Sequence, residues 1–201
     1  IALILEDWDG LIHELLRGEE RHHLFALSGD YKHAHDAWPF GQPAERNVLE
    51  ALSQGKTKQQ ACKTVAAPLR TLWVNAFQSS VFNEVLRQRH FDGTWNTILD
   101  GELVWNHEGG GRTFIASPED CEDPEFQDRI ASFSISPSGP LWGAKMRLPE
   151  SQVLVLEASV LDSFGVNTQQ LNNMKKMAKG TRRPLRVSVT NEEIQTNSDD
   201  G

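Results

Sequence analysis

The feature that most constrains the fold is a long amphipathic segment, LRTLWVNAFQSSVFNEVLRQR, at residues 69–89. Its apolar residues recur at intervals of three and four, the spacing that places side chains on one face of an α-helix. These residues are Leu69, Leu72, Trp73, Ala76, Phe77, Val81, Val85 and Leu86. Pro68 stands where the first turn of a helix tolerates proline. The sequence therefore predicts a helix with one face packed against a core.

Polar residues interrupt this segment at positions where stronger helix formers would be usual. They are Asn75, Gln78, Ser79, Ser80 and Asn83. Two interpretations are open. The amides and hydroxyls either serve a function, or they bond to neighbouring loops and to their own backbone.

Four segments, in order along the chain, resemble the TruD family of tRNA pseudouridine synthases. The first is NAFQSSVFNEVLRQR at residues 75–89, and the second is Gly93 and Trp95 followed by DGELV at 100–104. The third is SISPSGPLWG at 134–143, with Ser138 where the family usually has threonine, and the fourth is GTRRPLRV at 180–187. The resemblance covers more than half of the chain.

The resemblance implies a catalytic aspartate in a Gly-x-Lys-Asp motif, acting as nucleophile or base at the ribose. The chain contains no Lys-Asp pair and no Asn-x-Phe-Gly segment. We therefore expect a parent enzyme that isomerises uridine, at position 13 of tRNA, to pseudouridine, and a chain that is not active alone. No metal or organic cofactor is expected.

The resemblance also implies that this region forms the RNA-facing wall of the tRNA cleft. The candidate RNA-binding residues are Gln78, Ser79, Asn83, Arg89, Arg182, Arg183 and Arg186. For Asn83 and Arg89, bracing the helix against the sheet is an equally open role. We expect Trp142 to pack rather than to stack on a base, and Gly139 and Gly143 to need positive φ.

The net charge of −8 is unusual for an RNA-binding protein, which normally presents a basic surface. Much of the acid lies at residues 117–128 and 191–201. A basic cluster near the C-terminal end could bind RNA, although its lysines could instead complement a helix C-terminus. The cluster consists of Lys175, Lys176, Lys179, Arg182, Arg183 and Arg186.

The pattern along the chain predicts an α+β fold, with helices packed around a small antiparallel sheet. Residues 1–180 would form the TruD-type insertion domain, and residues 181–201 would begin the return to a catalytic domain. Within the insertion domain we expect helices at 1–92, mainly strands at 93–157 and helices again at 158–180. The expected strands are WNTILDGELVW (95–105), RTFIAS (112–117), FSIS (133–136) and QVLVLEAS (152–159), with a turn at 137–143.

The two ends of the chain suggest a piece of a longer protein. The apolar helical pattern begins at Ile1 with no capping residue ahead of it. At the other end PLRVSV (184–189) resembles a strand, and Asp199, Asp200 and Gly201 a hairpin turn without a second strand. We expect the chain to continue in both directions.

Other function classes have weaker support. Asp7, Asp9, Asp30 and Asp36 fit helix caps and solvated positions better than catalysis. Two cysteines far apart, Cys62 and Cys121, indicate free thiols.

A group of four histidines does not offer the spacing of four that paired metal ligands on a helix need. They are His22, His23, His33 and His35. With no apolar run long enough to span a bilayer, we expect a soluble, cytoplasmic monomer whose partner is tRNA. The alternatives are a free-standing RNA-binding module without an active site and an acidic protein-interaction domain.

Overall fold

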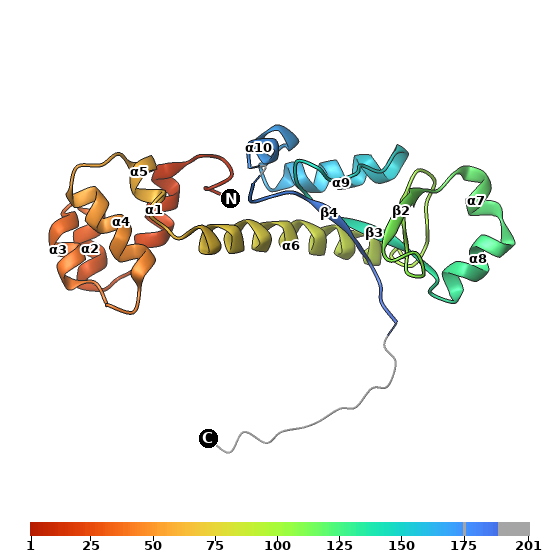
Figure 1. The fold of residues 1–201 in the computed structure, drawn as a ribbon, viewed down its shortest axis with the longest axis horizontal. Helices are drawn as coiled ribbons and strands as arrows, with labels where there is room; N and C mark the ends of the chain where they lie inside the picture. Colours follow the sequence, from red (N-terminus) through yellow and green to blue (C-terminus); the bar gives the residue numbers. More distant parts are fainter. Residues whose placement is uncertain (175, 189–201) are drawn as a thin grey trace, which may run out of the picture. The chain divides into compact units, whose positions relative to one another are not determined.

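The computed structural model describes residues 1–174 and 176–188, and contacts divide the chain into two compact units (Figure 1). The first unit contains residues 1–83, 141–146 and 158–181. The second contains residues 84–140 and 147–157 and, among the described residues, 182–188. The boundary expected at residue 180 remains a prediction.

Five short helices open the first unit, where α2 packs on α3, α3 on α4, and α5 on both α4 and α1 (Figure 1). They are α1 (Trp8–Leu16), α2 (Arg21–Leu27), α3 (Tyr31–Ala37), α4 (Pro43–Ser53) and α5 (Lys58–Cys62). The expectation of an uncapped helix at Ile1 was wrong. Helix α1 begins at Trp8, and the Asp7 side chain caps it by accepting a hydrogen bond from the Gly10 backbone N–H at 2.9 Å.

The long amphipathic segment forms α6 (Ala67–Phe91), the longest of the described helices, which contributes to both units. Its buried stripe differs from the predicted one. The buried side chains are Val74, Phe77, Gln78, Val81, Val85 and Arg89. Leu72, expected in the core, is 60% exposed. The buried face is therefore turned about the helix axis relative to the predicted one, because the polar residues Gln78 and Arg89 lie on it.

The second unit is built around a sheet with strand order β2-β1-β3-β4. The strands are β1 (Leu103–Asn106), β2 (Arg112–Ile115), β3 (Ile135–Leu141) and β4 (Thr181–Pro184). Strand β1 pairs antiparallel with β2 and with β3, in a register that sets Val104 opposite Phe114 and Pro137. Two helices, α7 (Pro118–Glu122) and α8 (Pro124–Ala131), follow β2.

A small core forms between this sheet and α8. Its buried members are Ile98, Val104, Ala116, Phe126, Ile130 and Ile135, with Phe114 and Cys121 packed against them. The acidic segment at residues 117–128 thus forms α7 and part of α8. Phe126 is the residue of this segment that is buried in the core.

Several local predictions were wrong. The expected turn at residues 137–143 is largely strand β3, and the expected strand at 152–159 lies in α9 (Ser151–Ser163). In α9 the buried residues Val153, Glu157, Val160 and Leu161 follow helical spacing, with a charged residue in the stripe. The last strand runs over Thr181–Pro184 rather than from Pro184 onward, and residues 189–201 lie outside the described part.

Helix α10 (Thr168–Asn173) completes the described elements, and the α+β class with helices around a small antiparallel sheet is confirmed. Among the described residues, no helix is both long enough and apolar enough to cross a membrane.

Candidate RNA-facing residues and the buried arginine network

Seven residues were predicted to contact RNA, and four of them lie inside the protein. Gln78, Arg89, Arg182 and Arg186 are between 1% and 9% exposed. Ser79, Asn83 and Arg183 are exposed. Direct RNA contact stays a prediction for these residues, and the four buried side chains each form hydrogen bonds within the fold.

Gln78 holds a loop of the first unit against α6. Its Nε2 donates a hydrogen bond to the Trp142 carbonyl oxygen at 2.6 Å. Trp142 is 2% exposed and packs, as expected. The Ser80 hydroxyl donates to the Ala76 carbonyl at 3.0 Å, within its own helix. For these two polar residues of α6, the structural interpretation that the sequence left open is the one observed.

Two glycines bring this loop against the segment that precedes β4. Gly180 has φ +77°, and a Cβ atom there would lie 2.7 Å from the Gly143 Cα. The expectation of positive φ at Gly143 and Gly139 was wrong, since neither has it. Gly143 is required by close backbone approach instead.

The same contact places exposed lysines on adjacent segments. The Lys145 backbone N–H donates to the Lys179 carbonyl at 2.8 Å, and both side chains are exposed. Lys176 is exposed as well, while Lys175 lies outside the described residues. Lys145 was missed because the predicted basic cluster was confined to residues 175–186, although this lysine closes the GPLWGAK segment.

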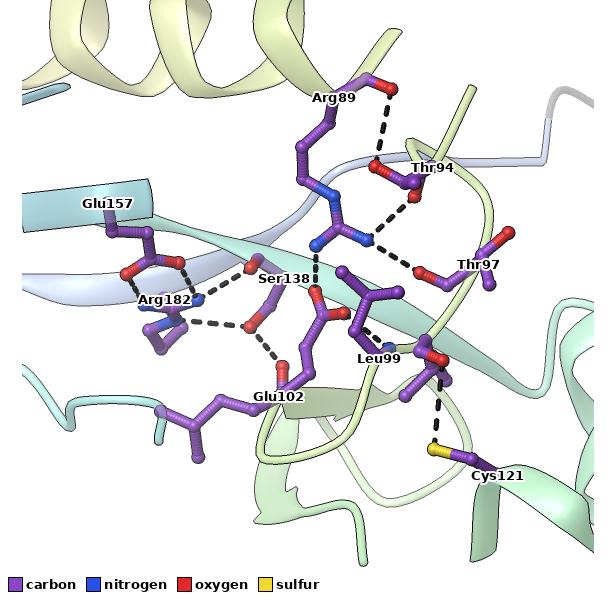
Figure 2. A network of polar contacts seen from close by, with 11 residues as sticks. Arg89, Thr94, Thr97, Leu99, Glu102, Cys121, Ser138, Glu157 and Arg182 are labelled. Carbon is purple, nitrogen blue, oxygen red and sulfur yellow. Dashed lines mark hydrogen bonds and ion pairs between the residues drawn. The ribbon is translucent and has the colours of Figure 1, made fainter. Parts of the chain in front are cut away.

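In the second unit Arg89 ties the C-terminal end of α6 to the loop before β1 (Figure 2). Its Nη1 forms an ion pair with Glu102, and its Nη2 donates to the carbonyls of Thr94 at 2.7 Å and Thr97 at 2.6 Å. Glu102 also accepts a hydrogen bond from the Leu99 N–H at 3.0 Å. Arg89 therefore has the bracing role that the sequence left open.

Arg182 forms a second buried pair in the same unit (Figure 2). Its two Nη atoms donate to the two carboxylate oxygens of Glu157, both at 2.7 Å. Its Nε donates to the Ser138 Oγ at 3.1 Å and its Nη2 to the Ser138 carbonyl at 2.6 Å. The Ser138 hydroxyl in turn donates to the Leu103 carbonyl. The position therefore uses a hydroxyl, a group that threonine also carries.

Burial dominates the electrostatics of the two carboxyls. It raises the pKa of Glu102 and of Glu157, and the guanidinium groups of Arg89 and Arg182 oppose the rise. Each arginine is thus the group that stabilises its buried partner in the ionised form. Removing one would leave a carboxyl that prefers to be protonated.

Arg186 is the third buried arginine of the second unit. It donates to the Ser136 Oγ at 3.1 Å and to the Ile135 carbonyl at 3.0 Å, and its guanidinium lies 4.2 Å from the centre of the Phe133 ring. Burial lowers its pKa. Because these contacts are internal, Arg186 fastens the chain after β4 to the start of β3.

Comparison with known proteins decides the family. The family model "tRNA pseudouridine synthase D (TruD)" matches residues 14–201. The chain belongs to the TruD family. This confirms the resemblance drawn from the four sequence segments.

Curated relatives agree with this assignment. The chain is similar to tRNA pseudouridine synthase D of Geobacter sulfurreducens, with 31% identity over 99% of the chain and 50% of the relative. For the protein of the same name from Syntrophotalea carbinolica the identity is 27% over 94% of the chain and 45% of the relative. The chain therefore spans about half the length of the curated relatives it matches.

The fold has a solved counterpart. A crystal structure from Methanosarcina mazei, described as tRNA pseudouridine synthase D (TruD), matches with a TM-score of 0.75 at 19% identity. The match covers 92% of this chain and 46% of that one. At this identity the likeness shows the fold alone.

Proposed function

We propose that this chain is part of a tRNA pseudouridine synthase of the TruD type and supplies an RNA-facing wall of its tRNA cleft. The observation that carries the proposal is the family match over residues 14–201. The chain spans half the length of its Geobacter sulfurreducens relative. The whole enzyme would isomerise uridine to pseudouridine, at position 13 by the family resemblance. We expect it to act as a cytoplasmic monomer.

The reaction requires the target nucleotide to leave its stack, the glycosidic bond to break and a carbon–carbon bond to form to the same ribose. The aspartate that the resemblance implies for this step has no counterpart in the chain, which lacks a Lys-Asp pair. The chain alone is therefore not expected to form pseudouridine, and no metal or organic cofactor is expected to act in the step.

The RNA contacts that we propose come from exposed residues. Lys145, Lys176, Lys179 and Arg183 would neutralise phosphates, which supply most of the affinity of such interfaces. Ser79 and Asn83, one turn apart on α6 and both exposed, would donate or accept hydrogen bonds with the RNA. The buried residues act indirectly, as Gln78 does by holding the loop that carries Lys145.

The test is the binding of unmodified tRNA to the 201-residue chain, measured by fluorescence anisotropy at a fixed salt concentration. We expect the triple variant Lys145→Ala, Lys179→Ala, Arg183→Ala to bind about tenfold more weakly or worse. The control is Lys32→Ala, which removes one exposed positive charge from α3. Equal affinity of the triple variant and the control would refute these phosphate contacts, and no binding by the wild type would favour a protein-interaction domain.

A further inference from the structure

A cluster of two histidines and a glutamate lies in the first unit, between the end of α1 and the start of α2. Glu20, His22 and His23 each offer one ligand atom, and these atoms all lie within 4.8 Å of one another. Neither the RNA-facing role nor the isomerisation uses these side chains. Imidazole nitrogen and carboxylate oxygen are the usual partners of Zn²⁺ in sites with an open position.

The hydrogen bonding of His23 leaves one ring nitrogen available as a ligand. Its Nδ1 lies 3.0 Å from the Leu16 carbonyl oxygen. Because a carbonyl only accepts, Nδ1 carries the proton of the neutral ring, and Nε2 keeps its lone pair. A backbone carbonyl on the second ring nitrogen is the arrangement that orients histidines which bind metals.

Packing holds both rings in place. The His22 and His23 ring centres are 4.2 Å apart, and each lies edge-on to Trp38 at 4.6 Å. His22 is 8% exposed, and its Nδ1 lies 3.5 Å from the Glu20 carboxylate. The Glu20 side chain is 78% exposed and can therefore move toward the rings.

We propose that Glu20, His22 and His23 bind one Zn²⁺ ion, with water completing the coordination. Zinc bonds of about 2.0–2.1 Å in a tetrahedron set ligand atoms about 3.3 Å apart. The separations in the cluster exceed that by at most about 1.5 Å. Rotation of the exposed Glu20 side chain would shorten its distances to the two rings, and any excess between the two imidazoles would be closed by small rotations of the rings. The ligands are side chains alone, and the backbone N–H groups of the seven-residue α2 take no part.

Such an ion would have a structural role. Through His23 and Leu16 it would fix the end of α1, through Glu20 and His22 the start of α2, and through Trp38 the end of α3. The spacing that predicts paired metal ligands on one helix is four residues. Adjacent histidines joined by a preceding carboxylate fall outside that pattern.

The test is calorimetric titration of the full 201-residue chain with ZnCl₂ after treatment with a chelator. We expect one Zn²⁺ per chain with a dissociation constant below about 100 μM. The variants Glu20→Gln and His23→Ala should each weaken binding by at least about tenfold. His33→Ala is the matched control, because His33 is an exposed histidine of α3 bonded to Asp30 and should leave binding unchanged.

His22 is 8% exposed, so His22→Ala would leave a cavity among the helices. The decisive variants are therefore those of Glu20 and His23, whose side chains are more exposed. A second measurement is quenching of tryptophan fluorescence by Cu²⁺, which should be largely lost in Trp38→Phe because this indole lies beside both rings. Binding weaker than 100 μM, or the same in Glu20→Gln, His23→Ala and wild type, would overturn the proposal.

Discussion

Replacing Arg182 by methionine tests whether this arginine stabilises the fold or binds RNA. The change keeps an unbranched stem and removes the hydrogen bonds to Glu157 and to Ser138. Because Glu157 is 0% exposed, it would remain as a buried carboxyl without its cation. Breaking one partner of a buried pair costs about 3–5 kcal/mol of unfolding free energy.

We expect the lower part of that range for Arg182→Met. Burial already raises the pKa of Glu157, so the carboxyl avoids part of the cost by taking up a proton. A carboxyl whose pKa is raised in the folded state contributes stability below its unfolded pKa and loses it as pH rises. The difference between variant and wild type should therefore shrink as pH falls from neutral toward about 4.3.

The assay is urea unfolding followed by far-ultraviolet circular dichroism, extended to a double-mutant cycle. Adding Glu157→Leu to Arg182→Met should cost less than the sum of the two single changes, because the second removes the charge that the first left unpaired. Binding of tRNA by the folded fraction should keep its salt dependence. A loss of stability below about 1 kcal/mol together with a reduced salt slope would refute the buried role and assign Arg182 to RNA.

Three further changes test local features. Gly180→Ala should cost about 3 kcal/mol of unfolding free energy in urea, because its φ is +77° and the added Cβ would lie 2.7 Å from the Gly143 backbone. The control Gly29→Ala, with φ +84° and open space around it, should cost about 1 kcal/mol. Equal costs would argue against the close approach. Burial raises the pKa of Cys62 to about 11, so iodoacetamide at pH 8 should label it about 200-fold more slowly than a free thiol, and rapid labelling of the folded chain would contradict this. Asp7→Ala should cost about 1 kcal/mol through the lost cap of α1, and an unchanged urea midpoint would show that the cap is dispensable.

The helical character of residues 1–92 was predictable because its signals are local, although the start of α1 and the buried face of α6 were not. The pattern at 69–89 contains most of α6, and Gly55, with φ +76°, follows the end of α4. Caps, glycine stops and helical spacing depend on neighbouring residues, so they can be recognised in one sequence. The α+β class followed from the change to strand-like segments after residue 93.

The second unit shows where local signals fail. The run QVLVLEAS is rich in β-branched and apolar residues, yet it lies in α9, because burial of Glu157 against Arg182 extends its helical stripe. Pro137 and Pro140 suggested a turn but lie in β3, where Pro137 sits opposite Val104 and its carbonyl accepts the Leu185 N–H. Long-range partners decide both cases, and periodicity does not reveal them.

The sequence could not predict which arginines of the candidate site are buried. The sequence contains segments of the family signature, but a match to a motif does not show whether an arginine is exposed or buried. Arg182 and Arg183 are adjacent in sequence and alternate across β4, so one is buried and the other exposed. Which of the two faces inward is set by Glu157, whose own burial was hidden by the wrong strand prediction.

The slope of tRNA affinity against salt concentration, measured for the wild-type chain and for Arg183→Ala, tests the central claim most directly. An RNA-facing wall predicts that log K falls linearly with log salt concentration, and that Arg183→Ala reduces the slope by about 0.7–1, one phosphate contact. An affinity that does not depend on salt, or a slope that Arg183→Ala leaves unchanged, would contradict the account.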